Sequence, residues 1–419
     1  MAGTPDLPDG LELRPVTPAE FPRFHLAVER TFLSDVNEHD RERERAIFEF
    51  DRSLAVWDGA DPVATIAAYS LEMTLPGGPR PVAGVSQVSV QPTHRRRGLL
   101  RTLMTQGLTD LHERGREAVA ALWATEPGIY GRFGYGAANR VASVTVRRGE
   151  GGFGFGAPEA TGTVRLGTPA DERPSLQVVL EQVRPHRVGL FARDGRWWDN
   201  RTFDPEDRRD GSSPLMAVVH EGDDGPDGYA LYSTAARWDD WVPRGTVDVR
   251  EIVAATPAAA NALWRYLLDT DLVAELKAWN LPLDSPLLHL MADARRARPT
   301  VRDNLHVRLV DLPRALSERS YAADVDVVLA VTDRSAPWNA RRWRVSAGPG
   351  GATCSPTTDA ADLSLDVREL GAAHLGGTTL GELARAGLVL EHRPGALAAA
   401  ARAWVLPPEQ PAPWCPMVF

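Results

Sequence analysis

The sequence predicts a mixed α/β and α+β protein of three domains, over residues 1–150, 151–298 and 299–419. At 419 residues, the chain is long enough for two or three domains. Its first two regions share an outline in which a helix precedes several strands. Its third region gives strands followed by helices, an order typical of an α+β layer.

Apolar periodicity places the individual elements. The first region is expected to contain a helix at Phe21–Phe32 and strands at 54–57, 63–71 and 120–125. The second is expected to contain a helix that ends at 183, strands at 228–232 and 247–253, and a helix at 258–268. The third is expected to contain strands at 307–310, 325–331, 343–345 and 361–365, then helices at 367–375 and 380–386.

The most informative segment joins a predicted strand, a basic turn and a predicted helix. Val88 and Val90 lie in the strand, and Pro92 ends it because proline has no N–H for the sheet. Three arginines and Gly98 follow, before a helical pattern that begins at Leu99. The backbone N–H groups of the turn and of the helix start would converge on one place, where the arginines add positive charge. We therefore expect an anion site suited to a pyrophosphate.

This unit resembles the pyrophosphate arm of the GCN5-related N-acetyltransferases (GNAT), which bind acetyl-CoA. Three arginines, Gly98 and two leucines give the form of the Eis branch (enhanced intracellular survival acetyltransferases), whereas the wider superfamily has glycine or alanine in place of Leu100. The resemblance implies acetyl-CoA as cosubstrate; the alternative is an ordinary basic loop before an amphipathic helix. The cofactor-binding residues that it implies are Val88, Ser89, Val90, Arg95, Arg96, Arg97, Gly98, Leu99, Leu100, Arg101, Thr125 and Glu126.

A second motif, I-Y-G-R-F-G-Y-G at 129–136, follows the strand predicted at 120–125. A run this rich in glycine and tyrosine indicates backbone held close to another group. The run is similar to that of Eis-like proteins, and this resemblance implies that Tyr130 protonates the departing CoA thiolate. Tyr135 is expected to be structural. The alternative is that both tyrosines are packed turn aromatics.

The C-terminal segment 406–419 contains five prolines, which exclude a helix and favour an extended path. It ends in tryptophan, methionine, valine and phenylalanine, which are too apolar for a simply solvated tail, so we expect the end to insert into the protein. By resemblance to Eis-like enzymes, the carboxylate of Phe419 reaches the active site of the first domain and acts as the catalytic base. A frayed tail is the alternative.

The same resemblance gives each domain a role. The first domain would be the active GNAT domain. The second would be a degenerate GNAT domain that binds no CoA and walls the substrate cleft, because residues 251–253 stand in place of the cofactor strand without a basic turn. The third is similar to the sterol carrier fold and would deliver Phe419. The resemblance also implies a homohexamer.

The expected chemistry is direct attack of a primary amine on the acetyl thioester. It needs a base, a proton donor and a donor to the oxyanion, which are expected to be Phe419, Tyr130 and backbone N–H groups near Val88. Cys354 and Cys415 have no visible histidine or acidic partner and no metal-like neighbours. We therefore expect neither a cysteine nucleophile nor a metal.

A net charge of −9 disfavours nucleic acid as a partner and would attract cationic amines. The resemblance implies a small-molecule acceptor that is a cationic polyamine, such as an aminoglycoside. This sequence has Val418 where the best-known pattern has glutamate, and Trp123 where it has histidine, so the pocket is expected to be less acidic. The acidic and aromatic candidates for its wall are Asp35, Glu38, Asp40, Glu126, Trp197, Trp198, Trp238 and Trp241.

Two other functions use parts of the same sequence. An acetyltransferase for protein lysines or for another small amine would share the chemistry. A non-catalytic lipid- or ligand-binding protein would use the third domain, and the intact cofactor arm, Tyr130 and Phe419 argue against it.

We find no signal peptide and no apolar run long enough to cross a membrane, so no membrane partner is expected. Only two cysteines in so long a chain predict a reducing cytoplasm.

Overall fold

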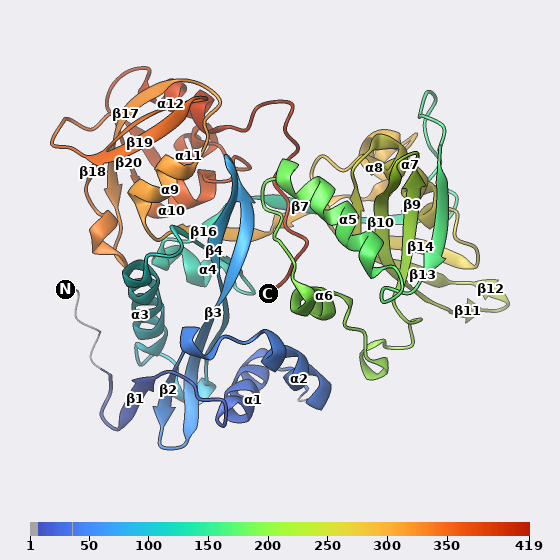
Figure 1. The fold of residues 1–419 in the computed structure, drawn as a ribbon, viewed down its shortest axis with the longest axis horizontal. Helices are drawn as coiled ribbons and strands as arrows, with labels where there is room; N and C mark the ends of the chain where they lie inside the picture. The colour runs from blue at the N-terminus through green and yellow to red at the C-terminus, as the bar shows by residue number, and fades with distance from the viewer. Residues whose placement is uncertain (1–6, 36) are drawn as a thin grey trace.

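The computed structural model describes residues 7–35 and 37–419. These residues form two seven-stranded sheets, a five-stranded sheet and a two-stranded hairpin. Figure 1 shows the second domain on the right, apart from the first and third, with the C-terminus between them. In the described part of the chain, no helix combines the length and apolar character needed to span a membrane.

The first sheet has the order β1-β2-β3-β4-β5-β16-β6. Residues 62–69 of its strand β3 are all buried, because α1 and α3 both pack on this strand. The strands are β1 (Leu11–Arg14), β2 (Ser53–Asp58), β3 (Asp61–Leu75), β4 (Gly78–Val90), β5 (Val119–Trp123), β16 (Leu305–Leu309) and β6 (Gly136–Ala137). The helices are α1 (Phe21–Phe32), α2 (Glu38–Ile47), α3 (Leu99–Arg114) and α4 (Pro127–Tyr130).

The second sheet has the order β15-β7-β14-β13-β10-β9-β8. Its strands are β15 (Thr300–Asp303), β7 (Arg140–Arg147), β14 (Val273–Pro282), β13 (Gly245–Ala254), β10 (Gly225–Ala235), β9 (Met216–Gly222) and β8 (Thr163–Gly167). Its helices are α5 (Arg173–Val183), α6 (Gly195–Thr202), α7 (Pro257–Leu268) and α8 (Leu287–Leu290). The hairpin of β11 (Trp238–Asp239) and β12 (Val242–Pro243) extends from this domain (Figure 1).

The third sheet has the order β19-β18-β17-β20-β21. Its strands are β17 (Val325–Thr332), β18 (Arg342–Gly348), β19 (Gly351–Pro356), β20 (Leu363–Asp366) and β21 (Val389–Glu391). Its helices are α9 (Leu312–Glu318), α10 (Val367–Ala373), α11 (Leu380–Arg385) and α12 (Ala396–Trp404). The predicted α+β layer is therefore present.

Three strands, β7, β15 and β16, cross the domain boundaries predicted after residues 150 and 298. β16 lies in the first sheet, antiparallel to β5, with Val307 opposite Ala121. β7 lies in the second sheet, where it pairs with β14 and β15. The segment at 307–310 was expected in the third domain, and it instead completes the sheet of the first. Strand pairing over this sequence distance leaves no local signal, because periodicity reports burial and not the partner.

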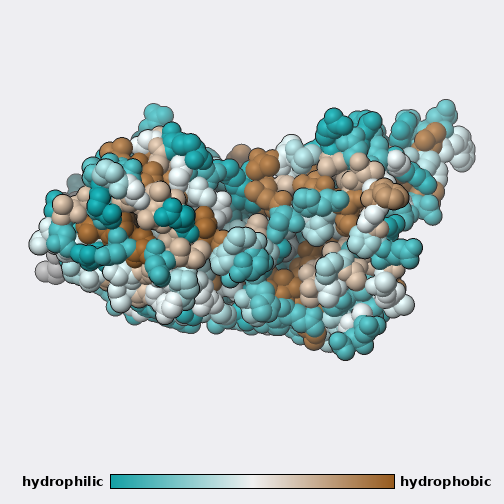
Figure 2. Space-filling model, turned by 90° about the horizontal axis from the view of Figure 1, so that it is seen from above, coloured by the Kyte–Doolittle hydropathy of each residue, from teal (hydrophilic) through white to brown (hydrophobic). Residues whose placement is uncertain are grey.

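The first and third domains share one hydrophobic cluster. Val307 of β16, Leu329 of β17 and Trp404 of α12 all belong to it. Cys415 and Met417 of the C-terminal segment also belong to this cluster, and both are buried. The extended tail is therefore part of the core and not a frayed end. Figure 2 shows the molecule from above, where hydrophobic residues form separate patches among hydrophilic ones.

Candidate active site

The strands β4 and β5 separate in front of the predicted cofactor arm. They pair in parallel only over residues 82–84 and 119–121. On its other side, β4 has a register shift against β3, and there Gln87 has a φ of 55°. A positive φ is uncommon for a residue with a Cβ, and here it accompanies a bulge that turns the strand. The bulge opens a wedge between β4 and β5 beyond Gly84.

The basic turn leads directly into α3. Gly98 precedes the helix with a φ of 85°, and Arg96 also has a positive φ, of 62°. The N–H of Thr102 donates to the carbonyl of Gly98 at 3.1 Å, so the N–H groups of residues 99–101 point out of the helix end. The three arginines of the turn are all exposed to solvent. This arrangement is suited to a diphosphate.

A cavity of 730 Å³, which we call the arm cavity, runs from this turn to α4. Of the predicted cofactor residues, those in its lining are Val88, Ser89, Val90, Arg95, Arg96, Gly98, Leu99, Leu100, Arg101, Thr125 and Glu126. Arg97 lies exposed on the same turn and is not part of the lining. Phe32 and Leu33, at the end of α1, also line the cavity, and no motif in the sequence predicts them there.

A second cavity of 630 Å³, which we call the acceptor cavity, adjoins the arm cavity. Four residues line both cavities: Phe32, Val88, Thr125 and Tyr130. Phe419 lines the acceptor cavity together with Met417 and Val418. The two predicted catalytic residues, Tyr130 and Phe419, therefore lie in the wall of one cavity. A thioester that reached from the arm cavity to Tyr130 would face an amine in the acceptor cavity.

Tyr130 ends the short helix α4 and is mostly buried. Burial, and to a smaller extent the Glu126 carboxylate, raise the pKa of Tyr130 to about 12. Its hydroxyl is therefore protonated at neutral pH, as a proton donor must be. Tyr135 lies behind it, with the two ring centroids 6.2 Å apart, and it lines neither of the two cavities.

The tail reaches the acceptor cavity along a path fixed by hydrogen bonds. Asn280 and Asn304 both donate from Nδ2 to the carbonyl of Cys415, at 3.1 Å and 3.2 Å. The N–H of Trp414 donates to the carbonyl of Val188 at 2.9 Å. These partners belong to the second domain and to the segment just before β16. Because they bind the backbone of the tail, they fix where its last residues lie.

The last three residues are held mainly by the first two domains. Trp123, at the end of β5, donates from Nε1 to the carbonyl of Met417 at 2.9 Å. The ring of Phe419 packs edge-on against Phe191, with centroids 5.2 Å apart. A Cβ at Gly84 would lie 2.5 Å from Cδ1 of Leu71 and 3.1 Å from the Phe419 ring, so this position favours glycine.

The acceptor cavity carries charges of both signs. Glu29 of α1 and Glu44 of α2 lie in its wall, facing Arg43, Arg201 and Arg250. Burial raises the pKa of Glu44 to about 7, against the opposing effect of the Arg43 charge. The acceptor cavity therefore carries less negative charge at neutral pH than it would if both carboxylates were fully ionised.

Most of the wall residues suggested by sequence lie elsewhere. Trp197 lines the acceptor cavity and packs against Tyr69, with centroids 5.2 Å apart. Trp198 is buried in the core of the second domain. Glu126 lines the arm cavity instead. The remaining candidates, which line neither cavity, are Asp35, Glu38, Asp40, Trp238 and Trp241.

The structure instead places four residues that were not predicted in the wall of the acceptor cavity: Glu29, Glu44, Arg43 and Trp279. Glu29 lies one turn after His25 on α1, and this spacing was the one available signal. Glu44 lies on α2, and the charged sequence of α2 has no apolar pattern that would predict a helix there. Figure 1 shows α1 and α2 side by side below the end of the tail.

Neither cysteine is placed to act as a nucleophile. Cys415 is fully buried, and Cys354 is partly buried in the third domain. Burial raises the pKa of both thiols to about 12. Because the thiolate is the reactive form, both are inert at neutral pH.

The second domain has a buried ion cluster centred on a carboxylate of β13. Glu251 of β13 accepts hydrogen bonds from Arg193 and Arg201, at 2.8 Å and 2.9 Å. Burial alone would raise the pKa of Glu251, but the two arginines outweigh it and lower the pKa to about 2. Arg201 also lines the acceptor cavity, so this cluster positions part of its wall.

Comparison with known proteins agrees with this architecture. Acetyltransferase (GNAT) domain models match residues 12–138 and 189–309, and a sterol carrier protein domain model matches residues 312–416. The N-acetyltransferase Eis of Mycobacterium tuberculosis is 35% identical over 385 residues, which cover 88% of this chain and 90% of that protein. The chain belongs to the Eis family of GNAT acetyltransferases.

Other relatives extend this Eis-family assignment. An uncharacterized N-acetyltransferase of Streptomyces avermitilis is 45% identical over 383 residues, covering 91% of this chain and 92% of that protein. The crystal structure of Eis1 from Mycobacterium abscessus superposes with a TM-score of 0.83 and 32% identity, covering 97% of this chain and all of that one. The protein is therefore an N-acetyltransferase with tandem GNAT domains and a sterol-carrier domain, as the motifs predicted.

Proposed function

We propose that this Eis-family enzyme transfers the acetyl group of acetyl-CoA to a primary amine of a cationic polyamine, such as an aminoglycoside. The main support is that Tyr130 and Phe419 line one cavity, which adjoins the cavity of the cofactor arm. The pyrophosphate would bind at the turn of residues 95–101. The thioester would lie beside Val88 and Tyr130, where the two cavities meet.

The reaction follows from two groups at this junction and from Phe419 in the adjoining acceptor cavity. The Phe419 carboxylate takes a proton from the ammonium group, directly or through a water molecule, and the free amine attacks the thioester carbon. Backbone N–H groups near Val88, exposed where β4 leaves β5, stabilise the oxyanion. As the C–S bond breaks, Tyr130 donates its proton to the thiolate sulfur. The attacking nitrogen loses its second proton to solvent as the tetrahedral intermediate collapses. The products are an amide, CoA thiol and this released proton, and the proton held by the carboxylate returns to the tyrosine through solvent.

The walls of the acceptor cavity favour a cationic acceptor with an extended polar body. Glu29 and Glu44 supply negative charge, and the three arginines restrict where an ammonium group can lie. Trp197 and Trp279 supply aromatic surface, which attracts cations through the ring faces. A bare monoamine would use little of this surface.

Release of CoA with a panel of amines tests the proposal. The panel holds an aminoglycoside, a linear polyamine, a lysine peptide and butylamine, with the product position determined by mass spectrometry. We expect the aminoglycoside or the polyamine to give the highest kcat/KM. A preference for the lysine peptide would contradict the proposed substrate class. No amide product from any amine, with acetyl-CoA bound normally, would contradict the proposed activity.

The proposal also includes a cellular location and an oligomeric state. A cytoplasmic location is supported by the two unpaired cysteines. A homohexamer is carried over from the family resemblance, and light scattering on the purified protein measures it. A monomer in solution would contradict that assembly without affecting the chemistry.

A further inference from the structure

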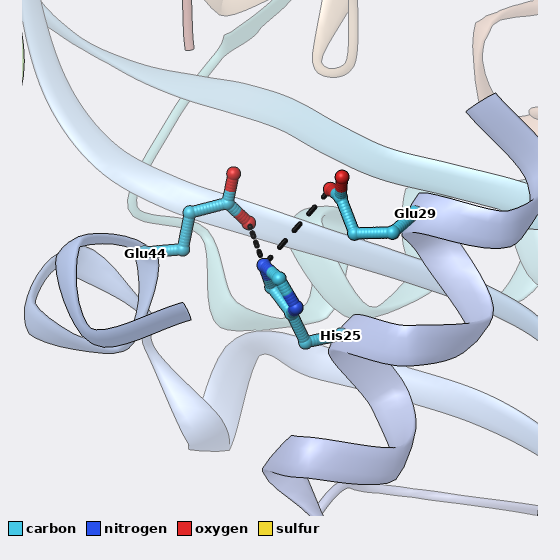
Figure 3. Close-up of side chains that lie close together, drawn as sticks. All are labelled: His25, Glu29 and Glu44. Carbon is cyan, nitrogen blue, oxygen red and sulfur yellow. Dashed lines mark ion pairs between the residues drawn. The ribbon is translucent and has the colours of Figure 1, made fainter. Parts of the chain in front are cut away.

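Three potential metal ligands converge in the wall of the acceptor cavity. His25 and Glu29 lie on α1, and Glu44 lies on α2. Figure 3 shows both carboxylates turned towards one nitrogen of the imidazole ring. That nitrogen, Nε2, lies 3.6 Å from Oε2 of Glu44 and 3.9 Å from Oε1 of Glu29.

The helix geometry explains this convergence. Residues four apart on a helix lie on the same face, which brings His25 and Glu29 together. The side chain of Asn37 accepts a hydrogen bond from the N–H of His39 and so caps α2 at its start. α2 packs beside α1 and carries Glu44 to the same place. No short sequence motif joins the three residues, which is why the sequence predicted no metal site.

The imidazole nitrogens of His25 make no hydrogen bond, although its ring packs against Phe21. The residue is 1% exposed. A buried polar group without a partner costs about 1–3 kcal/mol. The ring is nevertheless aimed between two carboxylates that would repel each other when both are ionised. A cation bound among the three atoms would satisfy the imidazole and offset both charges.

The size of the cluster indicates which cation fits. The three ligand atoms lie within 4.8 Å of one another. With the two distances given above, a point equidistant from all three lies at most about 2.4 Å from each, close to Zn–N and Zn–O bonds of about 2.0–2.2 Å. An ammonium nitrogen, which hydrogen-bonds at about 2.7–3.2 Å, would lie outside the plane of the three atoms and not between them.

We propose that His25, Glu29 and Glu44 form a binding site for a divalent transition metal of the Zn²⁺ type. One imidazole and two carboxylates are ligands that Zn²⁺ accepts, and three protein ligands leave a position for water on the cavity side. Gln87, the residue of the β4 bulge, donates from Nε2 to Oε2 of Glu44 at 3.0 Å. Such hydrogen bonds to a ligating carboxylate orient it toward the metal.

Titration calorimetry with Zn²⁺ on the untagged, metal-free protein tests this site without any substrate. We expect one Zn²⁺ per chain in the wild type. His25→Gln and Glu29→Gln should each weaken the binding at least about 100-fold, because changing residues that only support a ligand costs 10–100-fold. Glu29 is partly exposed, so its variant decides the test if the buried His25 variant does not fold. Circular dichroism and acetyl-CoA affinity report the fold of each variant.

A matched control lies on the same helix as Glu44. His39 is exposed on α2, so His39→Gln removes a histidine outside the cluster and should leave Zn²⁺ binding unchanged. Substitution with Co²⁺ gives a second readout, since a visible absorption band of a four-coordinate ion should appear in the wild type and vanish in Glu29→Gln. No Zn²⁺ binding by the wild type, or equal binding by the wild type and Glu29→Gln, would overturn the proposal. Both results are read from metal binding alone, with no acceptor or acetyl-CoA present.

Discussion

The indole Nε1–H of Trp123 donates a hydrogen bond to the carbonyl oxygen of Met417 at 2.9 Å. Trp123 is the last residue of β5, the strand that diverges from β4 at the arm cavity. Met417 is two residues from Phe419. The strand that forms one side of the proposed cosubstrate site therefore also holds the tail that supplies the proposed base.

Trp123→Phe should lower turnover by loosening the tail. The change keeps an aromatic ring and removes the N–H donor, and one hydrogen bond contributes about 0.5–1.5 kcal/mol. We expect kcat to fall by up to about tenfold, and carboxypeptidase to remove the last residues faster. Trp338→Phe is the control, because Trp338 makes a similar bond to the carbonyl of Val310, at 2.8 Å, away from both cavities. An equal loss of kcat in both variants would attribute the effect to general destabilisation.

Tyr130→Phe should remove the proton donor and little else. The pKa of about 12 keeps the hydroxyl of Tyr130 protonated across the working pH range. We expect kcat to fall by roughly 10²–10⁴ with acetyl-CoA affinity nearly unchanged. Tyr135→Phe removes a hydroxyl from the ring behind and should change kcat much less. Comparable losses in the two variants would indicate packing and not proton transfer.

Gly98→Asp should weaken acetyl-CoA binding at the basic turn. A Cβ at Gly98 meets no atom within 4 Å, so the substitution fits in space. The φ of 85° makes any side chain there strained, and the aspartate adds a carboxylate next to the expected pyrophosphate. Calorimetry should show affinity reduced more than tenfold, or by more than about 1.4 kcal/mol.

Gly98→Ala separates the two effects of that change, because it imposes the same backbone strain without the charge. We expect it to destabilise the turn while acetyl-CoA affinity stays within a few-fold of wild type. Unchanged affinity in a folded Gly98→Asp protein would show that the pyrophosphate binds elsewhere.

Glu251→Gln should destabilise the second domain in a pH-dependent manner. The change leaves the buried Arg193 and the partly buried Arg201 without their carboxylate, and breaking a buried pair costs about 3–5 kcal/mol. Because the folded pKa of Glu251 is about 2, below its ordinary 4.5, the carboxylate stabilises the fold above about pH 4.5. That stabilisation is lost as pH falls from 4.5 towards 2. The difference in Tm between wild type and variant should therefore be large at pH 7 and shrink below pH 4.5.

Asp326→Asn is the control for this change. Asp326 pairs with Arg344 at the surface, where both side chains are about half exposed, and such pairs contribute about 0–1 kcal/mol. We expect its Tm to stay close to wild type at pH 7. A Tm difference for Glu251→Gln that does not change with pH would contradict the assigned pKa.

The elements that the sequence predicts correctly are those whose signal is local. α1 lies at Phe21–Phe32, where its apolar periodicity places it, and the strand, basic turn and helix of the cofactor arm follow one another along the chain. α2 was missed because only two of its residues, Asp40 and Ile47, are buried. A helix of such charged sequence is held by its cap and its neighbours and leaves no apolar stripe.

The residues of the candidate site also divide into those with a local sequence signal and those without one. The arm residues and Tyr130 lie in contiguous motifs, so sequence predicts them. The wall of the acceptor cavity is drawn from α1, α2, β14 and α6, whose proximity depends on how the domains pack. Gln87 is the clearest example of a site residue that sequence does not predict. Its positive φ and its hydrogen bond to Glu44 arise from a β-bulge, and the alternation of valines in this strand gives no sign of a bulge.

The turnover of an enzyme extended beyond Phe419 tests the central claim most directly. If the terminal carboxylate is the base, two added residues must move it or expel the tail from its path, and a displacement of about 1 Å can cost 100-fold in rate. We expect a Gly-Ser extension to lower kcat roughly 100-fold with acetyl-CoA affinity and Tm unchanged, while the same extension at the N-terminus has little effect. Full activity of the C-terminally extended enzyme towards its best amine would contradict a catalytic role for the Phe419 carboxylate.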